Sequence, residues 1–193
     1  MTVIAPLSTT QSVTQASFNK SYVATLSFVA ALGGLLFGFD TAIISGTQPF
    51  IIPYFKLSDV MLGQVVGSLL LGSATGALIA GKLSDIFGRK RILIACALLF
   101  ALFAFGAGLS NTVSVLIINR FIGGMAVGAA AMVSPMYIAE IAPAQIRGRL
   151  VSFYQLAIIS GILLAFASNY FLSGLSNNWR WMFASQAAPA LFS

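Results

Sequence analysis

Long apolar runs separated by short polar connections constrain this chain more than any other feature of its sequence. A membrane-spanning helix needs about 20 mostly apolar residues, and runs of that length recur from Tyr22 to the last residue. Charged residues make up 7% of the chain and hydrophobic residues 59%, whereas a soluble domain has about 25% charged residues. A soluble domain of this size could not hide so much apolar surface from water. The sequence therefore predicts an all-α polytopic membrane protein.

The apolar runs also place the individual spans and the connections between them. Residues 1–20 are rich in Ser, Thr and Gln, and they lack the positive start and apolar core of a secretory signal. We expect them to form a short disordered cytoplasmic tail, followed by one transmembrane bundle over residues 21–193. The predicted spans are residues 22–46, 60–80, 92–110, 112–138, 150–172 and a truncated sixth span over 181–193.

Lys and Arg are distributed unevenly between the two sides of the predicted bundle. Seven of the ten lie on the side of the N-terminus, two lie on the opposite side, and Arg120 lies inside a predicted helix. Because basic residues favour the cytoplasmic side, we expect a multi-pass protein of the cell (inner or plasma) membrane with a cytoplasmic N-terminus. The net charge of +6 then belongs to loops facing the lipid bilayer rather than to a nucleic-acid surface. The seven residues are Lys20, Lys82, Arg89, Lys90, Arg91, Arg147 and Arg149, and the two are Lys56 and Arg180.

The composition argues against catalysis and metal binding. The chain has no His and a single Cys, Cys96, so neither an intrachain disulfide nor a zinc-binding cluster can form. No pairing of a nucleophile with a base is visible in the sequence. We therefore expect a protein that is not an enzyme and that has no metal site.

Glycines recur at close spacing in the second and fourth predicted spans. Small residues four positions apart let two helix backbones approach closely in lipid, although glycine is also common in membrane helices generally. On either interpretation these residues contribute to packing rather than to chemistry. They are Gly63, Gly67, Gly72, Gly76 and Gly81 in the second span and Gly124 and Gly128 in the fourth.

Two charged residues lie deep inside predicted spans. Asp40 is the only charged residue from Val23 to Gly46, roughly 10 Å from the outer end of its helix, and Arg120 lies roughly 12 Å from the same side. Because a lone charge in low dielectric is costly, we expect the two to pair. The pair could be purely structural. Alternatively, Asp40 could take up and release a proton, because burial disfavours its charged form and Arg120 favours it.

Four motifs resemble those of a known transporter family. GKLSDIFGRKR (Gly81–Arg91) is similar to the pattern G-x-x-x-D-x-x-G-R-K/R, and RFIGGMAVG contains the R-x-x-x-G pattern. PMYIAEIAPAQIRGRL (Pro135–Leu150) is similar to P-x-Y-x-A-E-x-A-P-x-x-x-R-G, and WRWMF resembles the family's entry into its sixth helix. The chain thus resembles the sugar porters of the major facilitator superfamily. The resemblance implies the N-terminal six-helix bundle of that fold, truncated within helix 6.

The resemblance assigns roles to residues inside the predicted membrane region. Proton symporters of the family carry an acid at the position of Asp40, and facilitative carriers an uncharged residue, so Asp40 with Arg120 favours proton-coupled symport. Facilitated diffusion is the alternative. The only coupling agent implied is a proton, with no other cofactor.

The substrate implied by the resemblance is a monosaccharide. Gln155, Ile158 and Ile162 share one helix face, and the family places an aromatic residue near the substrate at Phe37. An amide can both donate to and accept from neighbouring hydroxyl groups, although Gln155 alone could equally bond another helix. Some pentose symporters have a second Gln where this chain has Ile162, which favours a hexose over a pentose.

A third group of residues resembles the family's cytoplasmic latch. In the family, such charged residues pair with counterparts on the other half and hold the inner side closed. A solvated charged loop is the alternative interpretation. The latch residues are Gly81, Asp85, Gly88, Arg89, Glu140, Arg147 and Arg149.

The family fold has twelve helices in two halves with the substrate between them, and it works by alternating access. We therefore expect this chain to be the N-terminal half (a fragment) of a transporter, inactive without its missing C-terminal half. A sugar sensor that does not transport, or a small subunit that oligomerises into a pore, are the other possibilities.

Overall fold

The computed structural model describes residues 20–175 and 178–187, with side chains from Ala31 onward. Within these residues the chain is built from helices, and α1 to α5 are long and apolar enough to cross a membrane. The predicted all-α class is therefore confirmed. The expected tail, apart from Lys20, and the end of the sixth predicted span (188–193) lie outside the described residues. The helices are α1 (Lys20–Phe55), α2 (Asp59–Phe87), α3 (Arg89–Gly108), α4 (Val113–Ile141), α5 (Arg147–Leu172) and α6 (Asn178–Ser185).

Most of these helices are longer than the predicted spans. α1 continues beyond Gly46 through Pro49 and Pro53 to Phe55, because a membrane helix tolerates proline where neighbouring groups compensate for the missing hydrogen bond. α2 and α4 both begin at hydroxyl caps, where Ser58 and Thr112 accept hydrogen bonds from backbone N–H groups of the first turn. At the other end α2 stops at Gly88, whose φ of 87° turns the chain directly into α3.

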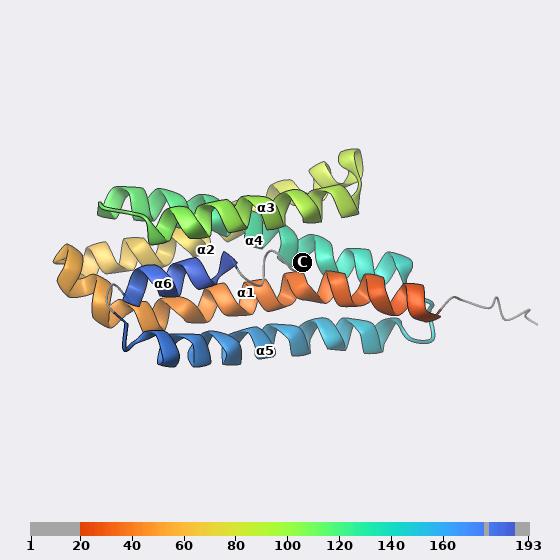
Figure 1. The fold of residues 1–193 in the computed structure, drawn as a ribbon. Helices are drawn as coiled ribbons and strands as arrows, with labels where there is room; N and C mark the ends of the chain where they lie inside the picture. Colours follow the sequence, from red (N-terminus) through yellow and green to blue (C-terminus); the bar gives the residue numbers. More distant parts are fainter. Residues whose placement is uncertain (1–19, 176–177, 188–193) are drawn as a thin grey trace, which may run out of the picture.

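The helices form an elongated antiparallel bundle in which α1 occupies a central place (Figure 1). α5 lies along one side of α1, and the α2, α3 and α4 helices lie on the other side. The most extensive contacts join α2 to α4 and α1 to α5, and the short α6 packs against α1 and α3. α1 and α4 also contact each other, so residues of these two helices can face a common interior.

Glycine determines how closely α2 approaches α4. A methyl group added at Gly72 would overlap the carbonyl of Phe121, and one added at Gly76 would overlap that of Met125. Gly124 and Gly128 on α4 meet the α2 backbone in the same way, so the predicted close packing is confirmed at these four positions.

The same glycine spacing has a different environment at the other end of α2. An added methyl group at Gly63 or Gly67 would have no neighbour within 4 Å. Both residues line an apolar groove of about 830 Å³ between α2 and α4. The packing expected from spacing alone is therefore wrong at these two positions in this structure.

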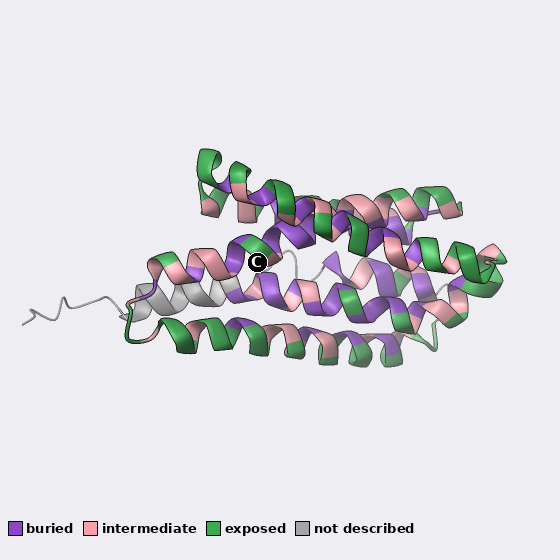
Figure 2. Ribbon diagram, turned by 180° about the vertical axis from the view of Figure 1, so that it is seen from behind, coloured by how far each residue is buried: buried purple, intermediate pink, exposed green. Residues whose placement is uncertain are grey.

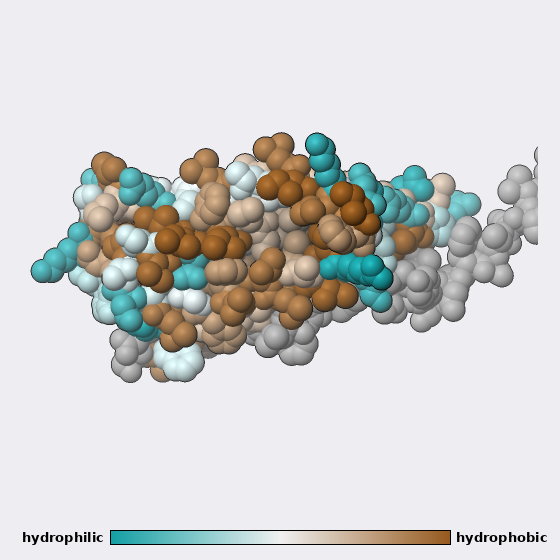
Figure 3. Space-filling model, turned by 90° about the horizontal axis from the view of Figure 1, so that it is seen from above, coloured by the Kyte–Doolittle hydropathy of each residue, from teal (hydrophilic) through white to brown (hydrophobic). Residues whose placement is uncertain are grey.

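Burial differs between the helices, whereas surface hydropathy differs between the middle and the ends of the bundle. Buried residues follow α1 and α4, while much of α5 is exposed (Figure 2). Apolar side chains cover most of the middle of the surface seen in Figure 3, and hydrophilic ones gather toward its two ends. Such a pattern suits a bundle that crosses a bilayer, with Asp40 and Arg120 in its buried centre.

Candidate functional site

Asp40 and Arg120 occupy the interior of the bundle from two different helices. Asp40 on α1 is 2% exposed and Arg120 on α4 is 3% exposed. The Nε of Arg120 donates to the carbonyl oxygen of Val65 at 3.1 Å, and its guanidinium lies 5.4 Å from the centre of the Phe183 ring. Helices α2 and α6 therefore hold the Arg120 side chain in place.

The direct ion pair that we expected between these residues is not formed. Among the described side chains, neither Asp40 nor Arg120 has an oppositely charged atom within 4.0 Å, although Arg120 is the charged group that acts on the Asp40 carboxyl. Both residues instead line one small cavity of about 10 Å³. The Val65 carbonyl and the Phe183 ring explain the separation, because they give the guanidinium a partner and a packing surface of its own.

Gln186 is a third polar residue at this cavity and was not identified from the sequence. It follows directly after α6, is 2% exposed and lines the cavity with Asp40 and Arg120. A polar amide inside the sixth apolar run is the signal that could have indicated it, since buried polar groups require partners.

The predicted sugar-binding residues lie on α1 and α5. Gln155 is exposed, whereas Phe37, Ile158 and Ile162 are partly buried. The α5 backbone at Ile158 packs so closely on α1 that a methyl group at Gly38 would overlap it. Within the described part of the chain Gln155 makes no side-chain hydrogen bond, so its amide is not used to join helices here.

Two further hydroxyl residues continue the Phe37 side of α1. Thr41 and Ser45 follow at intervals of four residues, and both are exposed. The Thr41 hydroxyl donates to the carbonyl of Phe37 at 2.7 Å, and the Ser45 hydroxyl donates to that of Ala42 at 2.7 Å. They were not predicted from the sequence, because single hydroxyl residues are common in membrane helices. Their spacing of four residues from Phe37 could have indicated that they share its helix face.

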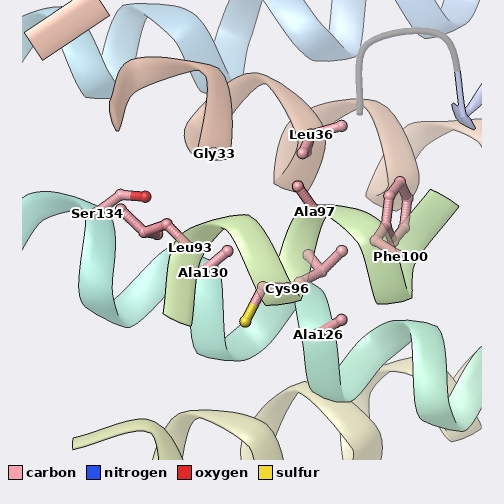
Figure 4. A pocket seen from close by; sticks show the side chains of 10 residues that line it. Gly33, Leu36, Leu93, Cys96, Ala97, Phe100, Ala126, Ala130 and Ser134 are labelled. Carbon is pink, nitrogen blue, oxygen red and sulfur yellow. The ribbon is translucent and has the colours of Figure 1, made fainter. Parts of the chain in front are cut away.

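A second cavity of about 30 Å³ lies between α1, α3 and α4 (Figure 4). Its lining is mostly apolar and includes Gly33, Leu36, Phe100 and the buried Cys96. Ser134 contributes a hydroxyl oxygen that is buried without a protein partner. The cavity is far smaller than the several hundred Å³ typical of a small-molecule site.

One end of the bundle carries a network of charges centred on Arg89. Its Nη1 lies 2.6 Å from Oδ1 of Asp85 and its Nη2 lies 3.1 Å from Oε1 of Glu140, and it also donates to the hydroxyl of Ser84. This network joins the end of α2 to the end of α4. The turn at Gly88 places Arg89 directly after α2 and so brings its side chain into reach.

The other predicted latch residues lie near this network but outside it. Gly81 is partly buried on α2, and Arg147 donates to the carbonyl of Ala142 at 3.4 Å. Arg149 is exposed and forms no ion pair with the described residues. The structure thus brings together Asp85, Gly88, Arg89 and Glu140, and leaves the two later arginines free of ion pairs with the residues that it describes.

An aromatic and cationic cluster closes the opposite end of the bundle. The Arg180 guanidinium lies 4.7 Å from the Trp179 ring and 5.8 Å from the Tyr54 ring. It also donates to Oδ1 of Asn111 at 3.0 Å. These contacts fasten α6 to the end of α1 and to the connection between α3 and α4.

The apolar helices and the buried charges are those of a multi-pass membrane protein. The family model described as sugar (and other) transporter matches residues 26–193. The chain belongs to this family, the sugar porters of the major facilitator superfamily, as its motifs predicted.

Several curated proteins are similar to the chain over most of its length. It is 44% identical to a glucose transport protein of Synechocystis, over 92% of this chain and 40% of that protein. It is 42% identical to the D-xylose-proton symporter of Escherichia coli, over 90% of this chain and 42% of that protein. An arabinose-proton symporter of Bacillus subtilis is 43% identical to the chain, over 91% of this chain and 39% of that protein. The chain thus spans about two fifths of the length of these relatives.

A solved structure gives the same result for the fold. The chain superimposes on the proton:xylose symporter XylE bound to 6-bromo-6-deoxy-D-glucose with a TM-score of 0.85 and 41% identity. The match covers 91% of this chain and 44% of XylE. The predicted N-terminal bundle of the major facilitator fold is therefore confirmed.

Proposed function

We propose that the chain is the N-terminal half of a proton-coupled monosaccharide transporter that works by alternating access. The observation that carries this proposal is Asp40, a carboxylic acid that is 2% exposed inside a membrane span. Intramembrane acids are expensive and usually functional. Two of the relatives described above are proton symporters, which supports the same conclusion.

The coupling follows from two opposing influences on Asp40. Apolar surroundings favour its neutral form, whereas the positive charge of Arg120 favours the carboxylate. A conformational change that alters the position of Arg120 relative to Asp40 then changes the affinity of Asp40 for a proton. Conversely, protonation favours the conformation in which the neutral acid is more stable. Proton binding and the side of the membrane to which the cavity opens become linked.

The sugar would bind along a wall formed by α1 and α5. Phe37 offers a ring for the C–H face of a sugar, and Gln155 offers an amide that both donates and accepts. Thr41 and Ser45 add hydroxyl groups next to Phe37, and Ile158 and Ile162 form the apolar part. The named relatives carry glucose, D-xylose or arabinose, so they do not favour a hexose, and that preference stays a prediction based on Ile162.

We place the Arg89 network and the N-terminus on the cytoplasmic side, because most of the basic residues lie at that end. There the contacts of Arg89 with Asp85 and Glu140 would hold the two helix ends in position, while Arg147 and Arg149 remain available to the other half of the transporter. A facilitative carrier is the second candidate, but Asp40 counts against it.

The proposal can be tested in a fusion of this chain with the C-terminal half of the E. coli D-xylose-proton symporter, reconstituted in liposomes. We expect Asp40→Asn to abolish sugar accumulation driven by a proton gradient while leaving sugar exchange intact. The matched control is Asp59→Asn, since Asp59 is an exposed aspartate at the start of α2. Accumulation that survives Asp40→Asn would assign Asp40 a structural role.

The same liposomes test the expected dependence on a second half. The 193-residue chain alone should give no sugar-dependent proton uptake, because the other wall of the binding site is contributed by the second half. Uptake by the chain alone would contradict the proposal that it is half of a transporter.

A further inference from the structure

We propose that the cavity shared by Asp40, Arg120 and Gln186 binds one water molecule, which connects the carboxylate to the guanidinium through hydrogen bonds. The inference builds on the proposed function, because it names what links the two charges that would control proton binding. Its own basis is the geometry of three buried polar atoms and the space between them.

The three polar atoms are complementary to a water molecule. Oδ2 of Asp40, Nη2 of Arg120 and Nε2 of Gln186 are all buried, and none makes a well-formed hydrogen bond to the described protein atoms, although the Gln186 side chain lies near enough to the Asp40 carboxyl to act on it. A buried polar group left in this way costs about 1–3 kcal/mol, and more when it is charged. Water could accept one hydrogen bond from each of the two nitrogens and donate one to the carboxylate oxygen. All three atoms would then be satisfied at once.

The space between these atoms has the size of a single water molecule. The cavity measures about 10 Å³, and one water needs roughly 10–15 Å³ measured in this way, with two to four polar partners. Apolar side chains such as Leu69 and Phe100 form much of the remaining lining. A sugar or a hydrated ion would not fit.

The neighbouring cavity in Figure 4 shows why sufficient volume alone does not make a binding site for an ordered water. That cavity is larger, about 30 Å³, but among the described atoms Ser134 Oγ is the only unpartnered nitrogen or oxygen in its lining. One partner is fewer than an ordered water requires. The expected water therefore belongs to the Asp40 cavity and not to the one beside Cys96.

X-ray hydroxyl-radical footprinting of the 193-residue chain in lipid nanodiscs tests the proposal, because a bound water is a local source of radicals. Leu69 of α2 lines the cavity and is 7% exposed. Ile138, near the C-terminal end of α4, is fully buried at 0% and does not line the cavity. We expect Leu69 to be oxidised several-fold faster than Ile138. Equal rates for the two side chains would overturn the proposal.

Gly123→Ala provides the decisive variant, because Gly123 lines the cavity. The added methyl group would lie 3.7 Å from Cβ of Phe103 and 4.0 Å from Cδ2 of Phe100, which is ordinary contact, so the variant should fold. Both rings also line the cavity, and the methyl group would occupy space that the water needs. Oxidation of Leu69 should fall to the level of Ile138, and an unchanged rate would contradict a bound water.

Gln186→Leu removes one hydrogen-bond donor and should also reduce the oxidation of Leu69. Gln64→Leu is the matched control, because Gln64 is exposed on α2 away from this cavity, and it should leave the rate unchanged. If Gln186→Leu does not fold, Gly123→Ala still decides the result. Footprinting reports on the water alone, so its failure is distinguishable from retention of transport by Asp40→Asn.

Discussion

The centre of the bundle and its basic end handle charge in opposite ways. In the centre, Asp40 and Arg120 are almost completely buried and make no direct ion pair. At the basic end, Arg89 contacts Asp85 at 2.6 Å and Glu140 at 3.1 Å, although the Asp85 and Glu140 side chains are 66% and 50% exposed. Direct contact is found where the carboxylates reach bulk solvent, and separation where both charged side chains are buried.

This difference fits the distinct tasks proposed above for the two regions. Exposed ion pairs contribute about 0–1 kcal/mol each, so the contacts of Arg89 can open and close at little cost. Buried charges depend strongly on each other, because removing one strands the other in low dielectric. The centre is therefore suited to linking protonation with conformation, and the basic end to a contact that is easily broken.

The largest effect is expected when the centre loses one charge. Arg120→Met should lower the free energy of unfolding by about 3 kcal/mol at neutral pH, because Asp40 loses its positive neighbour and the Val65 carbonyl loses a donor. Unfolding in mixed micelles, followed by circular dichroism, measures the change. The double variant Asp40→Asn/Arg120→Met should recover most of the loss, and equal losses in the single and double variants would show that the two charges are not coupled.

A smaller effect is expected at the basic end. A double-mutant cycle of Arg89→Ala and Glu140→Ala should give a coupling of about 0.2–1 kcal/mol, because both side chains reach solvent. The coupling should shrink further as salt is raised, since ions screen exposed charges. Arg149→Ala is the control and should change stability little. A coupling as large as that in the centre would remove the distinction between the two regions.

A third effect, of similar size to the second, concerns an exposed charge with no ion pair among the described residues. Lys56 follows α1 with a φ of 51°, and the next residue, Leu57, donates to the carbonyl of Ile52 at 3.0 Å. Glycine is the usual residue at such a helix end, so Lys56→Gly should raise stability by about 0.5–1 kcal/mol. The same unfolding assay measures it. A loss of stability would mean that surface charge matters more than the comparison implies.

The sequence was informative about the apolar runs that form α1 to α5 and about the burial of Asp40 and Arg120. Apolar runs reveal spans because lipid demands a continuous apolar surface. The expected distance of Asp40 from the outer end of its helix was wrong, because α1 continues to Phe55. Helix ends were harder to predict, because Gly46, Pro49 and Pro53 resemble a connection and yet lie within α1. In the bundle, neighbouring helices support the backbone at positions where an isolated chain would turn.

The environment of individual side chains could not be read from spacing. Gly63 and Gly67 have the same spacing as Gly72 and Gly76, but only the second pair meets α4. Gln186 became part of the central site only through the way in which α6 packs against α1 and α3. Such details depend on the angles between helices, which a single sequence does not specify.

The glycine contacts also divide the centre of the bundle into two closely packed helix pairs. α1 packs closely on α5, and α2 on α4, through backbone contacts in which an added methyl group would overlap the neighbouring helix. Asp40 belongs to the first pair and Arg120 to the second, so their cavity lies at the boundary between the two helix pairs. A small shift of one helix pair relative to the other would change the distance between the two charges while each pair kept its internal packing.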